Sequence, residues 1–165
     1  MVTLYNVISK DRFIARKNGD EDFIPDSLWQ NFLNLCTEYG TIIMGRKTYD
    51  AIQKYDLEPL RQFEALPVRK IVVTANHEFH PKQGYTVAHS PEEACALAPN
   101  ALVSSGPTLN NYLLKNGLVK KIILHEIPVA IGDGIKPFAD NIATLTPVPV
   151  SQHLNGVTVK EYAVS

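Results

Sequence analysis

The feature that most constrains the fold is a repeated alternation between short β-branched runs and longer stretches with helical spacing. The runs at 2–8, 41–44 and 69–74 have the length of strands, and apolar residues between them recur every three or four positions. This alternation is typical of an α/β protein built on a mostly parallel sheet. We therefore expect an α/β sheet in which helices connect the strands.

The individual elements follow from the same pattern and from its punctuation. Strands are expected at 2–8, 41–44, 69–74, 85–89, 101–104 and 119–127. Helices are expected from Pro25-Asp26-Ser27 to about Gly40, after Gly45 through Tyr49, Ile52 and Tyr55, from Ser90-Pro91 to about Ala98, and from Ser105-Gly106-Pro107-Thr108 to Asn116-Gly117. The segments 145–154 and 157–163 flank Asn155-Gly156, which predicts an antiparallel hairpin at the end of the sheet.

Size and charge exclude several classes of protein. A chain of 165 residues predicts one domain, 1–165, and a net charge of −1 gives no field that would hold nucleic acid. No apolar run approaches the roughly 20 residues that span a bilayer, and the first residues lack the pattern of a signal peptide, so we expect a cytoplasmic protein. Cys36 and Cys95 lie in apolar patterns, so we interpret both as buried hydrophobic residues rather than a disulfide or metal site.

Two turns combine a strand end, small residues and a helix start. Gly45-Arg46-Lys47-Thr48 offers free backbone N–H groups, two cations and a hydroxyl, which suits a phosphate, although solvated basic residues in an ordinary turn would look the same. Ser104-Ser105-Gly106-Pro107-Thr108 would let a pyrophosphate approach the backbone, but it also fits a capped helix with proline in its first turn. Two such turns at one edge of a sheet would face each other across a crevice, a common place for a dinucleotide.

These residues also carry a family resemblance. The segment IMGRKTY (43–49) resembles the "IMGR-x-T-W/Y" segment of dihydrofolate reductases, and DRFIA (11–15), after the first strand, is similar to their "DRVIG" entry. Other segments resemble the RibD C-terminal reductase branch of the same superfamily, namely Asp22-Phe23, 105–109, 117–119 and 128–135 with Phe138. The likeness covers about 2–138.

The resemblance implies an NADPH-dependent reductase with a dihydrofolate reductase-like three-layer fold, whose sheet ends in an antiparallel C-terminal hairpin. It departs from the family where paired glycines are replaced by Ser104-Ser105 or Ser105-Gly106, and where Leu109 replaces an aromatic residue. The residues it assigns to the cofactor lie in four segments: Ile14 and Ala15; Gly45, Arg46, Lys47 and Thr48; Thr74, Ala75 and Asn76; and Ser104, Ser105, Gly106, Pro107 and Thr108.

The resemblance leaves the substrate and the catalytic acid open. Dihydrofolate reductases place an acid near the start of the first long helix, where this chain has Asp26 beside Ser27, and Asp22 lies in the preceding loop. A helix cap explains Asp26 equally well, and a solvated charge explains Asp22. The substrate is expected to contact Asn6, Val7, Leu28, Trp29, Phe32 and His125.

Three functions remain in view at this stage. Reduction of 7,8-dihydrofolate, a step of one-carbon metabolism, is the first choice. The alternatives are the pyrimidine reductase of riboflavin synthesis and a nucleotide-binding protein without catalysis. The two reductases imply a small pterin or pyrimidine substrate. We expect a monomer or homodimer, with neither nucleic acid nor membrane as a partner.

Overall fold

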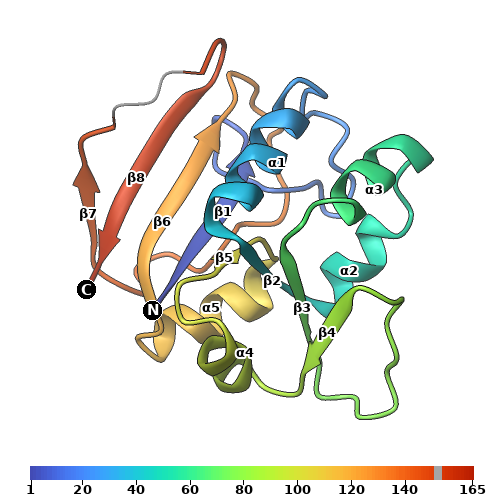
Figure 1. Ribbon diagram of the computed structural model, residues 1–165. Helices are drawn as coiled ribbons and strands as arrows, with labels where there is room; N and C mark the ends of the chain where they lie inside the picture. The colour runs from blue at the N-terminus through green and yellow to red at the C-terminus, as the bar shows by residue number, and fades with distance from the viewer. Residues whose placement is uncertain (151–153) are drawn as a thin grey trace.

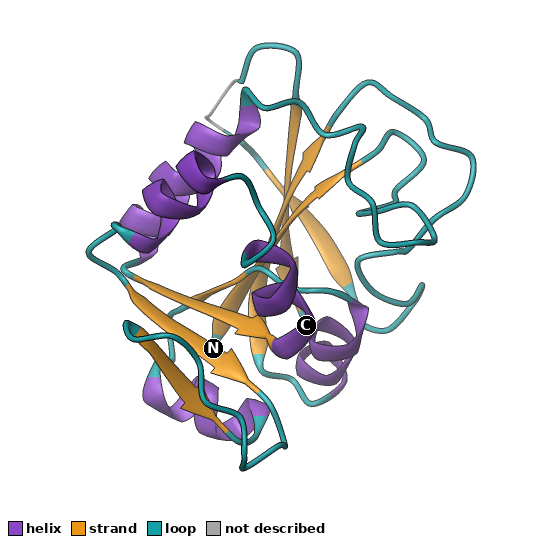
Figure 2. Cartoon of the chain, turned by 90° about the vertical axis from the view of Figure 1, so that its right-hand side faces the viewer, coloured by secondary structure: helices purple, strands orange, loops and turns teal. Residues whose placement is uncertain are grey.

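One eight-stranded sheet organises the computed structural model, which describes residues 1–150 and 154–165 (Figure 1). The strand order is β4-β3-β2-β5-β1-β6-β8-β7; β1 to β6 run parallel, and β8 and β7 are antiparallel to their neighbours. The strands are β1 (Val2–Ile8), β2 (Thr41–Gly45), β3 (Arg69–Val73), β4 (Tyr85–Ala88), β5 (Leu102–Val103), β6 (Val119–Glu126), β7 (Leu145–Val148) and β8 (Thr158–Val164). The predicted mostly parallel sheet is thereby confirmed, and Figure 2 shows its strong twist.

Helices cover both faces of the sheet and complete three layers. α1, α2 and α3 pack with one apolar cluster, which includes Tyr5 and Phe63, and α4 and α5 pack with a second cluster, which includes Leu4 and Leu113. The helices are α1 (Leu28–Tyr39), α2 (Arg46–Ile52), α3 (Leu57–Glu64), α4 (Pro91–Leu97) and α5 (Pro107–Lys115). None of the helices in the described residues is long and apolar enough to cross a membrane.

The central strands are apolar on both sides because both sides are covered. Ile42 and Ile43 are neighbours on β2 that point to opposite faces, and both are almost completely buried. At the end of the sheet, Val148 of β7 is exposed. The central strands are therefore apolar at consecutive positions, whereas a strand at the edge of the sheet has exposed residues.

The second predicted helix is in fact two helices. α2 ends at Ile52, and Tyr55 lies in the connection that leads to α3. Asp56 has an extended backbone, with φ −53° and ψ 150°, which interrupts the helical path. Phe63 of α3 is completely buried, so α3 adds an apolar anchor to the core that the sequence analysis missed.

The predicted cap at the start of α1 is wrong. Ser27 has helical dihedrals and its side chain makes no capping hydrogen bond, nor does the side chain of Asp26. The N–H groups of Leu28 and Trp29 instead donate to the carbonyls of Pro25 and Asp26, at 3.1 and 3.0 Å. Because the chain already turns before the helix begins, backbone carbonyls satisfy donors that a cap would otherwise serve.

Other terminal signals are confirmed. Ser90 accepts a hydrogen bond from the Glu93 amide at the start of α4, and Gly40 ends α1 with a left-handed backbone at φ 70°. The turn at Asn155-Gly156 closes through the Val157 N–H and the Leu154 carbonyl, 3.2 Å apart, and leads into β8. Of the strand predicted at 145–154, β7 covers only 145–148, and 151–153 lie outside the described residues.

Candidate active site

The two glycine-containing turns lie beside each other at the carboxyl edge of the sheet. β2 and β5 are adjacent strands, so the starts of α2 and α5 are neighbours. The Gly45 N–H donates to Ser105 Oγ at 3.0 Å, and the Ser104 N–H donates to the Ile43 carbonyl at 3.1 Å. The predicted juxtaposition of these turns is confirmed, and a direct hydrogen bond holds their spacing.

A buried network of side-chain amides holds the turn at 104–108 in place. Asn6 and Asn110 each donate a side-chain N–H to the Ser105 carbonyl, at 2.9 and 3.1 Å. Asn110 Nδ2 also lies 3.1 Å from Asn6 Oδ1 and 2.9 Å from the Pro137 carbonyl. The side-chain amide of Asn110, which is completely buried, therefore connects β1, the turn after β5 and the segment at 137.

Gly106 leaves open space at the start of α5. It has φ −87° and ψ −175°, which any residue can adopt, and a Cβ atom placed there would meet nothing within 4 Å. The first-turn N–H groups of α5 have no intrahelical partner and point toward this side. The proline at 107 costs no hydrogen bond there, and Thr108 adds a hydroxyl.

The basic residues of the first turn differ in how freely they present their charge. The Arg46 guanidinium lies 3.8 Å from the centre of the Phe79 ring, and its Nε donates to both oxygens of Asp50 at 3.0 and 3.2 Å. Its side chain is still 39% exposed. Lys47 is exposed and Thr48 is half-buried, so the turn presents one oriented cation and one solvated cation.

The segment after β3 lies at the same edge and brings two histidines with it. Thr74 Oγ1 accepts the Asn76 N–H at 3.2 Å, and the Asn76 side chain in turn accepts the Glu78 N–H, while Ala75 is exposed. The rings of His77 and His89 stack with centroids 4.0 Å apart, and His89 Nδ1 lies 3.2 Å from the Thr74 carbonyl. Sequence reasoning missed this pair, although each residue follows the end of a strand within a few positions.

The long loop after β1 is anchored to the segment at 131–135. The Ile14 N–H donates to the Ile135 carbonyl and the Ile135 N–H donates to the Ala15 carbonyl, both at 2.8 Å. Asp11 accepts hydrogen bonds from Ser9 Oγ and from backbone N–H groups at 131 and 132. The Ser9 hydroxyl, ahead of these N–H groups, lowers the pKa of Asp11. The loop that carries Ile14 and Ala15 therefore has a defined position.

Aromatic side chains fill the space between α1, α3 and the sheet. Phe32 stacks on Tyr5 and on Phe63, with ring centroids 5.8 and 6.0 Å apart. Trp29 packs against Phe32 and Tyr55, and its Nε1–H donates to Gln62 Oε1 at 2.9 Å. Three of the residues expected to contact substrate, Val7, Trp29 and Phe32, therefore belong to one apolar cluster.

His125 lies on β6 beside this cluster. Its Nδ1 is 3.1 Å from the Tyr5 hydroxyl, and burial lowers the pKa of the imidazole to about 4. Burial also raises the pKa of Tyr5. At neutral pH the pair is thus a neutral phenol and a neutral imidazole.

Comparisons with known proteins agree with this architecture. The family model for dihydrofolate reductase matches residues 1–106. The chain belongs to the dihydrofolate reductase family. Curated protein sequences give no match, so the other relationships come from solved structures.

Three solved structures show how the fold is used elsewhere. A Shewanella sp. PV-4 protein named for riboflavin biosynthesis is 18% identical with a TM-score of 0.76, covering 99% of this chain and 98% of its own. The NADP(H)-bound dihydrofolate reductase of Enterococcus faecalis is 19% identical with a TM-score of 0.69, covering 99% of this chain and 96% of its own. The Thermotoga maritima diaminohydroxyphosphoribosylaminopyrimidine deaminase/5-amino-6-(5-phosphoribosylamino)uracil reductase is 17% identical with a TM-score of 0.71. The alignment covers all of this chain and 56% of that one. The fold is therefore shared by both branches of dihydrofolate reductase-like proteins.

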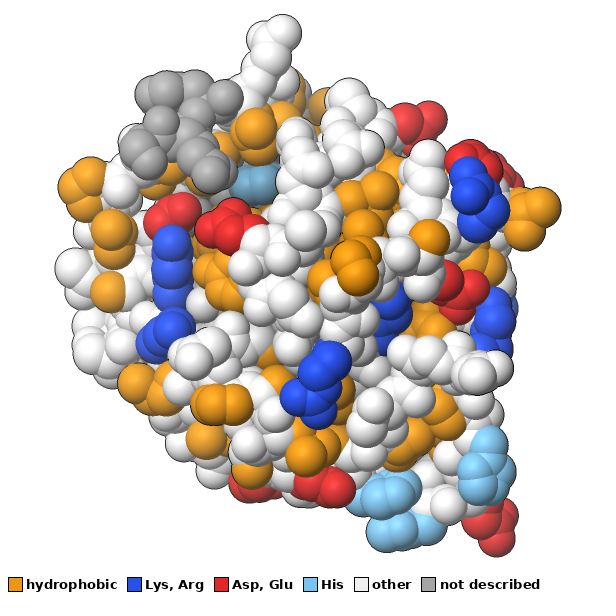
Figure 3. Space-filling view, viewed as in Figure 1, with side chains coloured by type: hydrophobic (Ala, Val, Ile, Leu, Met, Phe, Trp, Pro, Cys, Tyr) orange, Lys and Arg blue, Asp and Glu red, His pale blue; other side chains and the backbone are white. Residues whose placement is uncertain are grey.

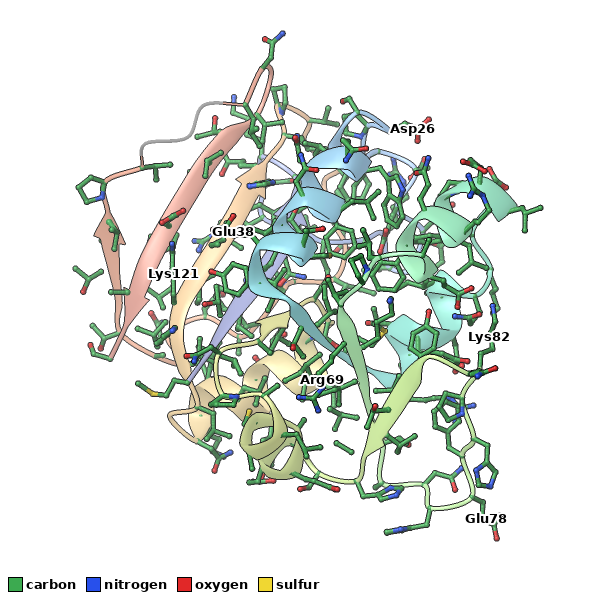
Figure 4. The ribbon with its side chains drawn as sticks, in the orientation of Figure 1. Asp26, Glu38, Arg69, Glu78, Lys82 and Lys121 are labelled. Carbon is green, nitrogen blue, oxygen red and sulfur yellow. The ribbon has the colours of Figure 1, made fainter. Side chains whose placement is uncertain are left out.

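The structure does not bring the acidic residues expected in a dihydrofolate reductase-like site into contact with the aromatic cluster. Asp26 is exposed just before α1, and its side chain makes no hydrogen bond to the described residues (Figure 4). Asp22 is paired with Arg16 Nε at 2.5 Å, and its side chain is 54% exposed. At the start of α1 the buried side chain is that of Leu28, which is 3% exposed.

Proposed function

We propose that the protein is an NADPH-dependent reductase that acts on a carbon–nitrogen double bond of a small heterocycle. The observation that carries the proposal is the hydrogen bond between the Gly45 N–H and Ser105 Oγ, which aligns two strand-to-helix turns at one sheet edge. Membership of the dihydrofolate reductase family supports the same reaction class.

The residues at this edge fit the cofactor. The open space beside Gly106 and the free N–H groups of α5 suit a pyrophosphate, with Ser104, Pro107 and Thr108 around it. Arg46 and Lys47 would meet the 2′-phosphate with Thr48, and Thr74 to Asn76 would flank the adenosine end, close to His77 and His89. Ile14 and Ala15 would line the nicotinamide, which supplies the hydride when the cofactor is bound.

We propose 7,8-dihydrofolate as the first substrate to test. The chain would bind the pterin between α1 and β6, with contacts expected from Leu28, Trp29 and Phe32 of α1, from Asn6 and Val7 near the end of β1, and from His125 near the end of β6. Asp26, whose carboxylate has no hydrogen-bond partner among the described residues, would orient the amino group and the ring nitrogens and support protonation. Asp22 is the second choice because Arg16 already holds it.

A specific observation keeps a second substrate in view. The side chain buried at the start of α1 is Leu28, so the described residues place no buried carboxylate where the family uses one. Two of the solved structures similar to this chain are named for riboflavin biosynthesis or for a pyrimidine reductase. A nucleotide-binding protein without turnover would share the cofactor edge alone.

One assay separates these functions. Purified protein is mixed with NADPH and either 7,8-dihydrofolate or the 5-amino-6-(ribosylamino)uracil phosphate, and NADPH absorbance is followed. We expect turnover with dihydrofolate, and NADH in place of NADPH is the control for cofactor choice. Turnover with the pyrimidine alone would favour the second substrate, whereas saturable NADPH binding without turnover on either would contradict the reductase.

A further inference from the structure

A cavity of about 340 Å³ lies between the ends of β1 and β6 and the segment at 136–140. None of the residues that line it is assigned above to the cofactor or to the substrate. A volume of this size is within the range of small-molecule sites. The cavity is therefore a candidate for a ligand of its own.

The inner wall of this cavity is apolar. Ile8, Leu124 and Phe138 line it and are 1%, 2% and 7% exposed. All three belong to the cluster that packs with α4 and α5, whereas Trp29 and Phe32 of the proposed substrate site belong to the other cluster. The cavity and the proposed substrate site therefore lie on opposite faces of the sheet.

Arg12 lines the cavity from a turn with an unusual backbone. Its φ of 76° lies in the left-handed region, which non-glycine residues rarely adopt. Two hydrogen bonds hold this turn, since the Arg12 N–H donates to the Ser9 carbonyl and the Ser9 N–H donates to the Phe13 carbonyl, both at 2.9 Å. Residues held in such conformations cluster at ligand sites, so the backbone at Arg12 points to a role in binding.

The charge of Arg12 is not neutralised by a direct contact. On the face shown in Figure 3, several lysine and arginine side chains lie beside acidic ones, and two such pairs are Lys121 with Glu161 and Lys82 with Glu64. Arg12 is exposed, and its guanidinium makes no hydrogen bond or ion pair with the described residues. Its N–H donors are therefore available to a ligand.

The two acidic residues of the cavity wall are already engaged. Both Asp11 oxygens accept hydrogen bonds, from Ser9 Oγ and from the backbone N–H groups at 131 and 132. Asp140 pairs with Lys136 at 2.5 Å, which lowers the pKa of the Asp140 carboxyl, and the charge of Arg12 adds to this effect. Both carboxylates are therefore ionised at neutral pH and repel a second negative charge on a ligand.

These groups together select a small monoanion. The planar guanidinium of Arg12 matches the two oxygens of a carboxylate, with which it forms charge-assisted hydrogen bonds. Asp11 and Asp140 disfavour a doubly charged group such as a phosphate, because like charges repel. The apolar inner wall favours a ring or a hydrocarbon chain attached to the carboxylate.

We propose that this cavity is a binding site for a small aromatic or aliphatic monocarboxylate. The carboxylate contacts the Arg12 guanidinium, and the apolar part packs against Leu124 and Phe138.

A ligand in this cavity contacts two segments that support the carboxyl edge of the sheet. Arg12 lies two residues before Ile14, in the loop that the segment at 131–135 anchors. Pro137 lines the cavity, and its carbonyl accepts a hydrogen bond from Asn110, which also holds the turn at 104–108. Occupation of the cavity therefore connects both supports, and this holds whether or not the protein is a reductase.

The test uses benzoate as the probe, with benzamide as the matched neutral compound. The full chain, labelled with ¹⁵N and with ¹³C at its methyl groups, is titrated at neutral pH. We expect saturable shifts that gather at 9–13 and 136–140, together with nuclear Overhauser effects from the benzoate ring to the methyl groups of Ile8 and Leu124. Benzamide should bind at least about fivefold more weakly, because it lacks the charge that Arg12 recognises.

Two variants and one control decide the location. Arg12→Asn removes the cation but keeps a residue type that tolerates the left-handed backbone, and it should weaken benzoate binding at least about fivefold. Asp140→Asn should strengthen benzoate binding, because it removes a repelling charge and frees Lys136 for the ligand. Arg61→Gln is the control, since it removes another exposed guanidinium that lies outside the cavity, and it should bind benzoate like the unchanged protein.

Three results would overturn the proposal. Shifts that gather around 45–48 and 104–108 would place the anion at the proposed cofactor edge instead. Unchanged benzoate affinity in Arg12→Asn, or the absence of saturable shifts in the unchanged protein, would remove the site. Circular dichroism checks the fold of Arg12→Asn, and if that variant does not fold, Asp140→Asn decides, since weaker or unchanged benzoate binding there contradicts the site.

Discussion

At the scale of single residues, an exposed charge or an open space beside the backbone indicates a residue that can bind a ligand rather than one that only supports the fold. Arg46 has both kinds of role, since it stacks on Phe79 and pairs with Asp50 while part of its guanidinium remains exposed. A Cβ atom at Gly106 would meet none of the described residues within 4 Å, so the glycine leaves open space at the start of α5. The Asp26 side chain makes no hydrogen bond or ion pair with the described residues, so its carboxylate is available to a ligand.

Arg46→Ala should weaken NADPH binding much more than NADH binding, because only NADPH has a 2′-phosphate for the guanidinium. A charge-assisted contact of this kind contributes on the order of 1.5–3 kcal/mol before solvent screening, and partial exposure reduces it. Titration of both cofactors by fluorescence measures the difference. Asp50→Asn is the control, since it removes the ion pair but keeps the cation; equal losses for NADPH and NADH in Arg46→Ala would contradict the assignment.

Asp26→Asn should lower turnover on the true substrate by roughly a hundredfold or more, the scale of general acid–base assistance. The melting temperature should change little, because the Asp26 side chain makes no hydrogen bond and no ion pair with the described residues. Steady-state kinetics and thermal melting test both statements. Asp22→Asn is the matched variant. If Asp22→Asn loses turnover while Asp26→Asn does not, the catalytic role belongs to Asp22. Unchanged turnover in both variants would contradict a catalytic role for either carboxylate.

At the scale of elements, the site depends on how neighbouring loops lock together. The turn after β5 is held by Asn6 and Asn110, and the loop after β1 is held by the segment at 131–135. Gly134 lies at the closest point of that second contact, where an added Cβ would come 2.3 Å from the Ala15 carbonyl oxygen. Close backbone approach, rather than an unusual φ, explains why glycine stands at 134.

Gly134→Ala should destabilise the fold by about 1–3 kcal/mol, because the backbone at Ala15 must move to make room. Urea unfolding measures the change in the free energy of unfolding. Gly106→Ala is the control, since the same extra methyl group meets nothing within 4 Å. Equal stability of Gly134→Ala and the unchanged protein would show that the loop does not need this contact.

Gly106→Val tests the turn at the start of α5 as a cofactor cradle. A Cβ atom at 106 would meet nothing within 4 Å among the described residues, and the rest of the valine side chain would extend into the space assigned to the pyrophosphate. We expect a native circular-dichroism spectrum together with loss of NADPH binding by titration. Normal NADPH affinity in this variant would refute the placement of the pyrophosphate beside Gly106.

At the scale of the whole molecule, stability depends on groups that are buried on both faces of the sheet. His125 is the clearest case, because burial lowers its pKa to about 4 in the folded state, against about 6.5 when unfolded. The unfolded chain therefore binds a proton at this residue before the folded chain does. The contribution of His125 to the free energy of unfolding is therefore complete above about pH 6.5 and is lost as the pH falls toward 4.

Between pH 6.5 and 4 this residue should cost about 3 kcal/mol of the free energy of unfolding. Urea unfolding across this pH range measures the slope, and most carboxylates remain ionised over much of it. His125→Gln should flatten the slope because glutamine does not titrate. An unchanged slope in that variant would assign the acid sensitivity to other groups.

The sequence by itself determined the order of elements and the residue types at the carboxyl edge of the sheet. Strand period, glycine stops such as Gly40 and the cap at Ser90 act over a few residues, so they can be recognised locally. The same holds for the two turns at Gly45 and Ser105, whose meeting follows from parallel strands ending at one edge.

Only the tertiary structure decided which side chains fill, anchor or open the space between elements. The buried Phe63 of α3, the amide network of Asn110 and the pairing of His125 with Tyr5 join residues far apart in the chain. No local pattern records such contacts, because they depend on which faces pack together. The cavity beside Arg12 likewise exists only because the segment at 136–140 returns to the ends of β1 and β6, and sequence spacing alone does not specify that return.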